Sequence, residues 1–224
     1  MSLKNVIFSS ILGDAMGLPY ERKGSKVLSN EVLPKWSCIA GGRYYAHTEI
    51  KDRGSWSDDA QLILATFRSL KKGDSWYDAM KSVELPAFLS YEQGAGRATK
   101  VACRVLEKGR LPFSEEGYYE AGGNGTVMRV QPHAFFGSSL EEKMSMALHN
   151  SILTHGSPVA LISSMLYVYT LVLLEANPYM TTEEFRSVAL QDIDIWSNLK
   201  YLEDTDDGLV FLNRSPYYYG NEWG

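Results

Sequence analysis

The 224-residue chain has few cysteines and no cluster of basic residues. Its two cysteines, Cys38 and Cys103, do not have the spacing of a metal site, so we expect two reduced thiols in a cytoplasmic protein. The net charge of -5 and the scattered Lys and Arg residues argue against a general nucleic-acid-binding surface. We therefore expect neither nucleic acid nor a cysteine-bound metal as a partner.

Signals for export or membrane insertion are also weak. The apolar run at 3–13 is short, and Asp14 interrupts it where a signal peptide would stay apolar. The uncharged stretch 156–174 approaches the length of a membrane span but has no basic flank. Because it begins with Ser157 and Pro158, which suit a helix start, we predict a central core helix, buried nearly all round, and no membrane partner.

Strand patterns, internal repeats and linkers are nearly absent, whereas apolar residues recur at helical spacing. These features predict one all-α domain over residues 1–224. We predict helices at 3–17, 58–72, 75–89, 97–108, 138–153, 158–176 and 182–202. The remaining long segments, 18–56, 110–137 and 203–224, lack periodicity and are expected to be loops that carry the functional residues.

Acidic residues stand directly before the helix predicted at 58–72. Ser57 is a suitable helix cap, and Asp58 and Asp59 suit the positive end of the helix. The same hydroxyl and carboxylates are ligands that Mg²⁺ or Mn²⁺ prefers, more so if Glu21 lies near them. The residues alone leave both interpretations open.

Small residues and one histidine mark further candidate sites. Gly94-Ala95-Gly96 precedes a predicted helix, where backbone N–H groups bind phosphate, although a plain turn also explains it. The glycine-rich segment 122–125 forms either a simple turn or a place where the backbone approaches a ligand. His155 precedes the apolar helix, either as a structural hydrogen-bonding group or as part of a site.

The order of these motifs is more specific than any one of them. Gly-Asp-Ala-x-Gly-x-Pro-x-Glu at 13–21 is followed by Ser-Asp-Asp at 57–59, Gly-Ala-Gly-Arg at 94–97, Gly-Asn-Gly-x-x-Met-Arg-Val at 123–130 and Thr-His at 154–155. The series resembles the ADP-ribosylglycohydrolase family over essentially the whole chain. The resemblance implies an orthogonal bundle of α-helices around a binuclear Mg²⁺ or Mn²⁺ centre. It also implies hydrolysis of the bond between ADP-ribose and a modified side chain or a small ADP-ribosyl compound.

The resemblance assigns metal and catalytic roles to residues of this chain. The groups that it implies at the metal centre are Glu21, Ser57, Asp58 and Asp59, of which Glu21, Asp58 and Asp59 are also the expected catalytic residues. Ser57 keeps the hydroxyl of the Thr that is usual in the family, whereas Ala60 replaces a second Thr and loses an oxygen. Glu21 is the residue expected nearest the reacting centre.

The resemblance also assigns substrate contacts. Gly94, Ala95 and Gly96 match the loop that wraps the diphosphate. Asn124 and Gly125 match the loop beside the ribose, and His155 matches a histidine of the same pocket. Asp14 and Arg129 are expected to be structural.

One departure from the family pattern lies near the end of the sequence. The family completes its metal centre with an Asp-x-Asp-Thr motif on a C-terminal helix, and the acidic residues of 202–208 lack that order. We therefore expect a bundle without its last helices and an incomplete second metal site. The alternatives to a hydrolase are an inactive member that binds ADP-ribose or serves structurally, and an unrelated helical regulator.

Overall fold

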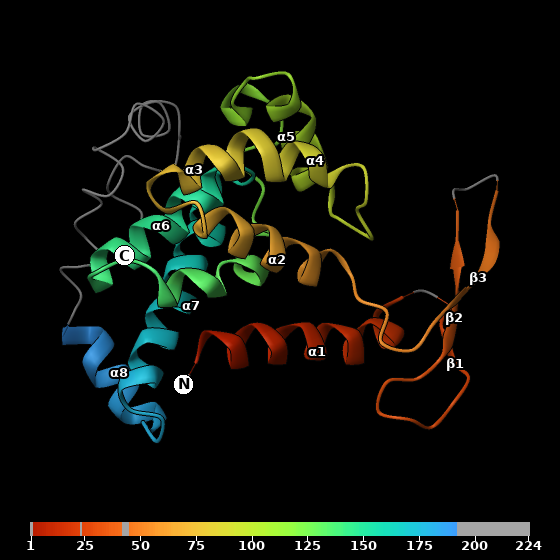
Figure 1. Ribbon diagram of the computed structural model, residues 1–224, viewed down its shortest axis with the longest axis horizontal. Coiled ribbons are helices and arrows are strands. Elements are labelled where there is room, and N and C mark those ends of the chain that lie inside the picture. Colours follow the sequence, from red (N-terminus) through yellow and green to blue (C-terminus); the bar gives the residue numbers. More distant parts are fainter. Residues whose placement is uncertain (1, 23, 42–44, 192–224) are drawn as a thin grey trace.

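The computed structural model describes residues 2–22, 24–41 and 45–191. Helices dominate this part of the chain, and its strands form one small antiparallel sheet (Figure 1). The predicted helical class is confirmed. The helices predicted at 58–72, 97–108 and 158–176 correspond to α2 (Asp58–Leu70), α5 (Arg97–Glu107) and α7 (Pro158–Ala176).

Helix α1 spans Leu3–Glu21 and is longer than the predicted 3–17. Pro19 lies inside the last turn of the helix. A proline removes one backbone hydrogen bond near a helix end, and here Leu18 and Pro19 are both buried, which offsets that loss. Because of this extension, the candidate site residue Glu21 is the last residue of α1.

An antiparallel sheet follows α1, where the sequence predicted only a loop at 18–56. Its strands are β1 (Lys26–Val27), β2 (Trp36–Ala40) and β3 (His47–Lys51), in the order β1-β2-β3. Trp36 and Cys38 of β2 are buried with Leu18, whereas Ile39, the residue after Cys38, is 58% exposed. This alternation is too short to be recognised among the polar residues around it.

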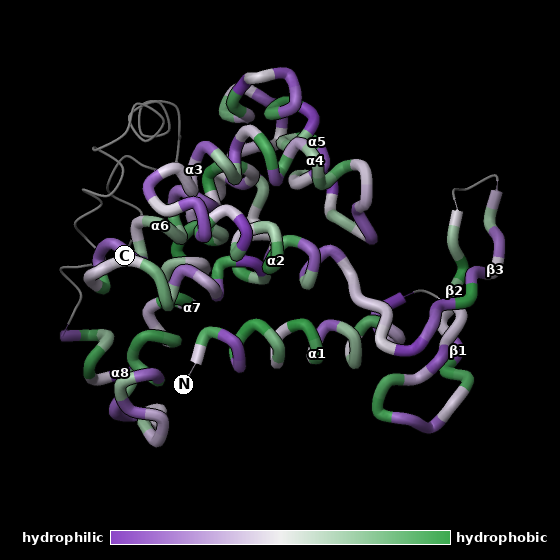
Figure 2. The backbone as a smooth tube through the Cα atoms, in the orientation of Figure 1, coloured by the Kyte–Doolittle hydropathy of each residue, from purple (hydrophilic) through white to green (hydrophobic). Residues whose placement is uncertain are grey.

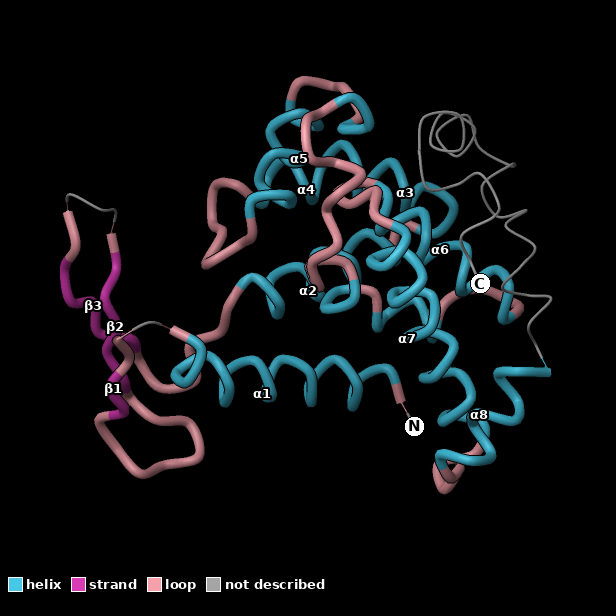
Figure 3. Tube along the Cα trace, turned by 180° about the vertical axis from the view of Figure 1, so that it is seen from behind, coloured by secondary structure: helices cyan, strands magenta, loops and turns pink. Residues whose placement is uncertain are grey.

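The sheet projects from the helical body as an arm between α1 and α2 (Figures 1 and 3). The chain runs outward along α1 and returns along α2, so the C-terminal end of α1 lies beside the N-terminal end of α2. Figure 2 shows apolar residues in the arm as well as in the helices, and Leu28 and Val32 of the β1–β2 loop are 54% and 73% exposed. The arm thus connects the C-terminal end of α1 to the N-terminal end of α2.

The helix predicted at 75–89 is continuous but irregular. It consists of α3 (Trp76–Ala79), a π-helical turn (Met80–Glu84) and α4 (Leu85–Phe88). Pro86 cannot donate a backbone hydrogen bond, and a wider turn before it accommodates that loss. Met80, Leu85 and Phe88 still point into the core.

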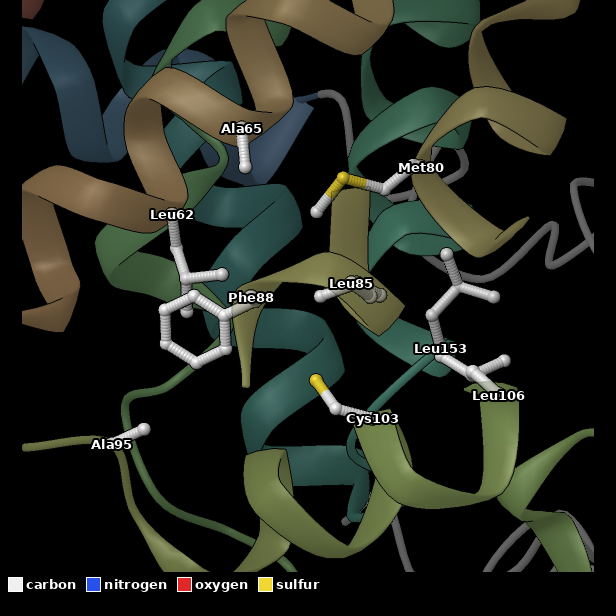
Figure 4. Packing of buried hydrophobic residues seen from close by; sticks show 9 residues of the cluster. All are labelled: Leu62, Ala65, Met80, Leu85, Phe88, Ala95, Cys103, Leu106 and Leu153. Carbon is white, nitrogen blue, oxygen red and sulfur yellow. The ribbon is translucent and has the colours of Figure 1, made fainter. Parts of the chain in front are cut away.

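One apolar cluster joins this irregular helix to α2, α5 and the end of α6 (Leu140–Ile152). Figure 4 shows its side chains converging from all four elements: Leu62, Ala65, Met80, Leu85, Phe88, Ala95, Cys103, Leu106 and Leu153. Cys103 contributes as a buried free thiol, and Cys38 is buried elsewhere, also without a disulfide. The cluster fixes α5 against α2, the two helices whose N-terminal ends carry the candidate acidic and glycine-rich motifs.

Helix α7 packs along α6 (Leu140–Ile152), which corresponds to the helix predicted at 138–153. The prediction that α7 is buried nearly all round is wrong, because Val159 and Leu166 are 66% and 40% exposed. One stripe that includes Leu161, Met165 and Val168 is buried, since α6 and the segment 127–135 pack against that side. By length and composition alone, α7 is the one helix among the described residues that could cross a membrane. This is weak evidence, because buried core helices meet the same criteria of length and apolarity.

The predicted loop 110–137 contains three short 3₁₀ helices, at Pro112–Ser114, Val127–Arg129 and Gln131–Phe135. Helix α8 (Thr182–Gln191) corresponds to the first part of the helix predicted at 182–202. Residues 192–202 of that helix and the loop predicted at 203–224 lie outside the described residues. So do the acidic residues of 202–208.

Candidate functional site

The motifs singled out in the sequence meet at a cleft of about 390 Å³. Its walls come from the end of α1, the start of α2, the loop and first turn of α5, the glycine-rich loop before Val127, and the segment before α7. The residues that line it are Glu21, Asp58, Asp59, Gly94, Gly96, Arg97, Ala98, Thr99, Gly123, Asn124, Gly125, Met128 and His155. A compact helical fold thus brings together residues from 21 to 155.

The three carboxyl groups of the cleft are brought together by the α1–α2 contact. Asp14, about two turns before the end of α1, accepts hydrogen bonds through Oδ2 from the N–H of Ser57 at 2.8 Å and of Ala60 at 3.2 Å. Asp14 therefore caps α2 across a gap of more than forty residues and holds its first turn against α1. This places Asp58 and Asp59 in the same cleft as Glu21.

Ser57 is the N-cap of α2, and its Oγ accepts a hydrogen bond from the N–H of Asp59 at 3.1 Å. The side chain is buried and is absent from the cleft lining. The helix-end interpretation of the Ser-Asp-Asp motif therefore holds for Ser57, while both aspartates serve the first turn and also line the cleft. A role of Ser57 at a metal stays a prediction.

Negative charge in the cleft is only partly compensated. Burial, followed by the charges of Asp58, Asp14 and Glu21, raises the pKa of Asp59 to about 6. Burial also raises the pKa of Asp58, and Asp14 and Glu92 add to this while Arg22 opposes it. Neighbouring carboxylates thus add to burial in making Asp58 and Asp59 harder to ionise, and such raised pKa values are common in functional sites.

A hard cation fits the chemistry of these donors. Carboxylate oxygens are the ligands that Mg²⁺ and Mn²⁺ prefer, and a cation would relieve the repulsion among Asp58, Asp59 and Glu21. Within the described part of the chain, however, no three His, Cys, Asp or Glu side chains are close enough to hold a metal between them. These residues would therefore supply only part of the coordination shell of such a cation, and waters or substrate oxygens would supply the rest.

The glycine loop before α5 is organised by an internal carboxylate. Glu92 Oε2 accepts hydrogen bonds from the N–H of Gly94 at 2.9 Å and of Ala95 at 3.0 Å, and Lys100 pairs with the other oxygen at 2.9 Å. The amides that we expected to face a diphosphate therefore already bind an anion. Ala95 itself is buried in the apolar cluster and does not line the cleft.

The backbone before α5 is tied to the start of α2. Gln61 Nε2 donates to the carbonyl of Tyr91 at 2.7 Å, and its Oε1 accepts from the N–H of Gln93 at 3.0 Å. Gly94 has φ +107°, and a Cβ there would lie 3.3 Å from Asp58 Oδ1 and closer still to the Arg22 guanidinium. Glycine is therefore required where the loop passes the carboxyl groups.

The glycine-rich loop lies against His155. A Cβ on Gly125 would lie 2.8 Å from His155 Cε1 and 3.2 Å from Thr99 Oγ1, so only glycine fits here. His155 is 3% exposed, and its Nδ1 lies 2.8 Å from the hydroxyl of Thr154. That hydroxyl also accepts from Arg129, which is fully buried.

Arg129 connects the glycine-rich loop with α6 and is structural, as expected. Its Nη1 donates to the carbonyl of Gly125 at 3.0 Å, and its Nε donates to Asn150 Oδ1 at 2.7 Å. Its Nη2 donates to the carbonyl of Asn150 at 2.7 Å and to Thr154 Oγ1 at 2.9 Å. All four acceptors are neutral oxygens, and burial lowers the pKa of Arg129 to about 10.

The cleft contains all but two of the residues proposed from the sequence, the exceptions being Ser57 and Ala95. Five residues of the cleft had no role assigned from the sequence: Arg97, Ala98, Thr99, Gly123 and Met128. They belong to the quoted motifs or, like Ala98 and Thr99, directly follow one, and their position beside the glycines was the only available signal. The capping by Asp14 and the hydrogen bonds of Glu92 depend on contacts that no local pattern reports.

Comparison with known proteins identifies the family. A family model described as ADP-ribosylglycohydrolase matches residues 3–215, which is nearly the whole chain. Neither the curated proteins nor the solved structures gave a significant match. The family match rules out an unrelated helical regulator and indicates, in general, a glycohydrolase that acts on ADP-ribosylated substrates. The chain belongs to the ADP-ribosylglycohydrolase family.

Proposed function

We propose that the protein is a metal-dependent hydrolase that cleaves the glycosidic bond between ADP-ribose and a modified side chain or a small ADP-ribosyl compound. The observation that carries this proposal is the cleft itself. It joins three carboxyl groups, two glycine-rich loops and His155 in one space of about 390 Å³. Mg²⁺ or Mn²⁺ is the proposed cofactor, held in part by Asp58, Asp59 and Glu21.

The carboxyl groups suit cleavage at the anomeric carbon of ribose. That reaction develops positive charge on the sugar, and carboxylates nearby stabilise it. A bound metal ion supplies orientation of ribose hydroxyls and a lower pKa for a bound water. Partial burial strengthens the effect of Asp58 and Asp59 on the sugar, because little water screens these two carboxylates.

The loops suit the rest of the substrate. Gly94, Gly123 and Gly125 let the backbone approach a ligand closely, and Arg97 offers a positive charge to a diphosphate. The N–H groups at the start of α5, which has no side-chain cap, add a positive helix end on the same side. A sugar nucleotide with its negative phosphates is therefore the class of ligand that we propose.

The test is release of free ADP-ribose from ADP-ribosylated proteins and small ADP-ribosyl compounds, with Mg²⁺ or with a chelator. We expect ADP-ribose release to require the metal. We also expect Asp58→Ala to lower the rate of release by about 100-fold or more, because the substitution removes a charge beside the reacting sugar. Asp74→Ala is the matched control, since Asp74 is an exposed first-turn acid outside the cleft. It should keep full activity.

The competing function is an inactive family member that binds ADP-ribose or serves structurally. Metal-dependent thermal stabilisation without any ADP-ribose release would favour it. Equal activity with and without chelator would overturn the metal dependence. Full activity of Asp58→Ala would overturn the role of the carboxyl groups.

A further inference from the structure

A chain of hydrogen bonds leads from the core to the one histidine of the cleft. Arg129 Nη2 donates to Thr154 Oγ1 at 2.9 Å, and the same oxygen lies 2.8 Å from His155 Nδ1. The opposite edge of the imidazole, with Cε1 and Nε2, lies beside Gly125, which also lines the cleft. The proton on the ring therefore depends on what the Thr154 hydroxyl does with its own proton.

The Thr154 hydroxyl has two places to donate its proton. One is the carbonyl of Ser151, at 3.5 Å, which is long for such a bond. That carbonyl already accepts the backbone N–H of Thr154 at 3.1 Å and of His155 at 3.0 Å, so both of its lone pairs are in use. The other is His155 Nδ1, at 2.8 Å. The second is far better, since a buried hydroxyl that fails to donate loses a hydrogen bond.

The positive charge of Arg129 strengthens this direction. A guanidinium that donates to the hydroxyl oxygen polarises the O–H bond and makes its proton a better donor to the next group. If Nδ1 carried the proton instead, Thr154 Oγ1 would accept from both Arg129 and His155. Its own proton would then have only the long contact with Ser151.

We infer that Arg129 and Thr154 hold His155 in the tautomer with the proton on Nε2, so that the ring acts in the cleft as a neutral hydrogen-bond donor. Arg129 and Thr154 are positioning residues in this arrangement. His155 binds an acceptor oxygen of the ligand and takes no proton from it. The identity of that ligand rests on the proposed function, in which the available acceptors are the ribose and phosphate oxygens.

The surroundings of the ring agree with a neutral donor. Burial, followed by the charge of Arg129, lowers the pKa of His155 to about 3. Protonation would place a second cation near Arg129 in the protein interior. The ring is also confined by Gly125 and Thr154, so it cannot rotate freely to exchange its two nitrogens.

The direct test is long-range ¹⁵N–¹H NMR of the unmodified protein, in which protonated and unprotonated ring nitrogens resonate in separate regions. The His155 signals are identified by their loss in His155→Gln. We expect Nε2 to carry the proton at pH 7 and to keep it as the pH falls to 5. A proton on Nδ1 in the unmodified protein would overturn the inference without reference to any activity.

A matched pair of variants tests the positioning role. Thr154→Val removes the hydroxyl with little change in shape, and Thr154→Ser keeps it. We expect Thr154→Val to mix the two tautomers and to weaken ADP-ribose binding by about tenfold, because one directed hydrogen bond is lost. Thr154→Ser should keep the tautomer and bind within about twofold of the unmodified protein.

The outcomes separate this inference from the proposed function. An unchanged tautomer in folded Thr154→Val would overturn the role of Arg129 and Thr154. Equal ADP-ribose affinity of the two variants would overturn the donor role of His155. Absence of ADP-ribose binding by the unmodified protein would overturn the proposed ligand, while the NMR spectrum would still decide the tautomer. If Thr154→Val fails to fold, the spectra of the unmodified protein and of Thr154→Ser carry the test.

Discussion

The carboxyl groups of the cleft and the buried Arg129 lie in opposite electrostatic environments. Asp58, Asp59 and Glu21 share a cleft, and the charges of Asp58 and Glu21 help to raise the pKa of Asp59. Arg129 is fully buried, yet its guanidinium makes four hydrogen bonds to neutral oxygens. The core thus supplies acceptors for the buried Arg129 cation, whereas the cleft concentrates negative charge.

The difference follows from what each region has to do. A buried charge without partners costs several kcal/mol, so a structural cation requires a complete set of acceptors. A binding site gains from groups that are satisfied only when the ligand arrives, at some cost to stability. Changes in the Arg129 network should therefore destabilise the protein, and neutralisation in the cleft should not.

The largest expected effect is that of Arg129→Met. It leaves Asn150, the carbonyl of Gly125 and the Thr154 hydroxyl without their donor, and we expect a loss of about 3–5 kcal/mol in the free energy of unfolding. Urea denaturation followed by circular dichroism measures it. Arg104→Met on the exposed side of α5 is the control, with an expected change within about 0.5 kcal/mol. Equal effects of the two substitutions would contradict the comparison.

Acid should weaken the core through its histidines. Burial, followed by the charges of Arg129 and His149, lowers the pKa of His133 to about 3, and His155 has a similar value. Below pH 6.5 these two histidines become protonated in the unfolded chain but stay neutral in the folded protein. The stability present above pH 6.5 is therefore lost progressively as the pH falls towards 3. At pH 5 we expect each ring to cost about 2 kcal/mol relative to pH 7.

A substitution at His133 tests this dependence. Neither ring nitrogen of His133 has a hydrogen-bond partner, and Trp76 packs against the ring at 5.1 Å, so His133→Phe keeps a ring in the same place. We expect it to lose less stability than the unmodified protein between pH 7 and pH 5. The exposed His47, replaced by Gln, is the control and should leave the pH dependence unchanged. A pH dependence unaltered in His133→Phe would refute the assignment.

The smallest expected effect has the opposite sign. Asp59→Asn removes a charge whose pKa is raised to about 6 by burial and by neighbouring carboxylates. Above pH 6 in the presence of a chelator we expect a gain of up to about 1 kcal/mol, after allowance for solvent screening of this partly exposed group. Thermal unfolding measures the gain, with Asp74→Asn as control. A clear loss of stability would show that the cleft carboxylates are structural.

Much of the fold could be predicted because its signals are local. The caps Ser57 and Ser139 and the 3.6-residue spacing located α2 and α6 to within a few residues. The arm was missed because its strands are at most five residues long and only Trp36 and Cys38 alternate clearly into the interior. The one-sided burial of α7 was missed because composition reports apolarity without reporting which faces a neighbour covers.

Within the site, residue chemistry was predictable and mutual geometry was not. Carboxylates, glycines and a histidine in that order were sufficient to suggest a ligand, and the cleft brings most of them together. The capture of the Gly94 and Ala95 amides by Glu92 was not foreseen, since a glutamate two residues earlier is usually a solvated surface residue. That contact depends on a loop held by Gln61 of α2.

The amino-acid sequence by itself determined the helices, their caps and the kinds of oxygen and nitrogen ligands available, because each depends on residues within about one helical turn. Only the tertiary structure decided that Asp14 caps α2, that Glu21 shares a cleft with Asp58 and Asp59, and that Arg129 donates to the Thr154 hydroxyl beside His155. Those relations join residues of different elements. They depend on the return of the chain through the arm and on the burial of Arg129. Neither feature can be predicted from residues that are neighbours in the sequence.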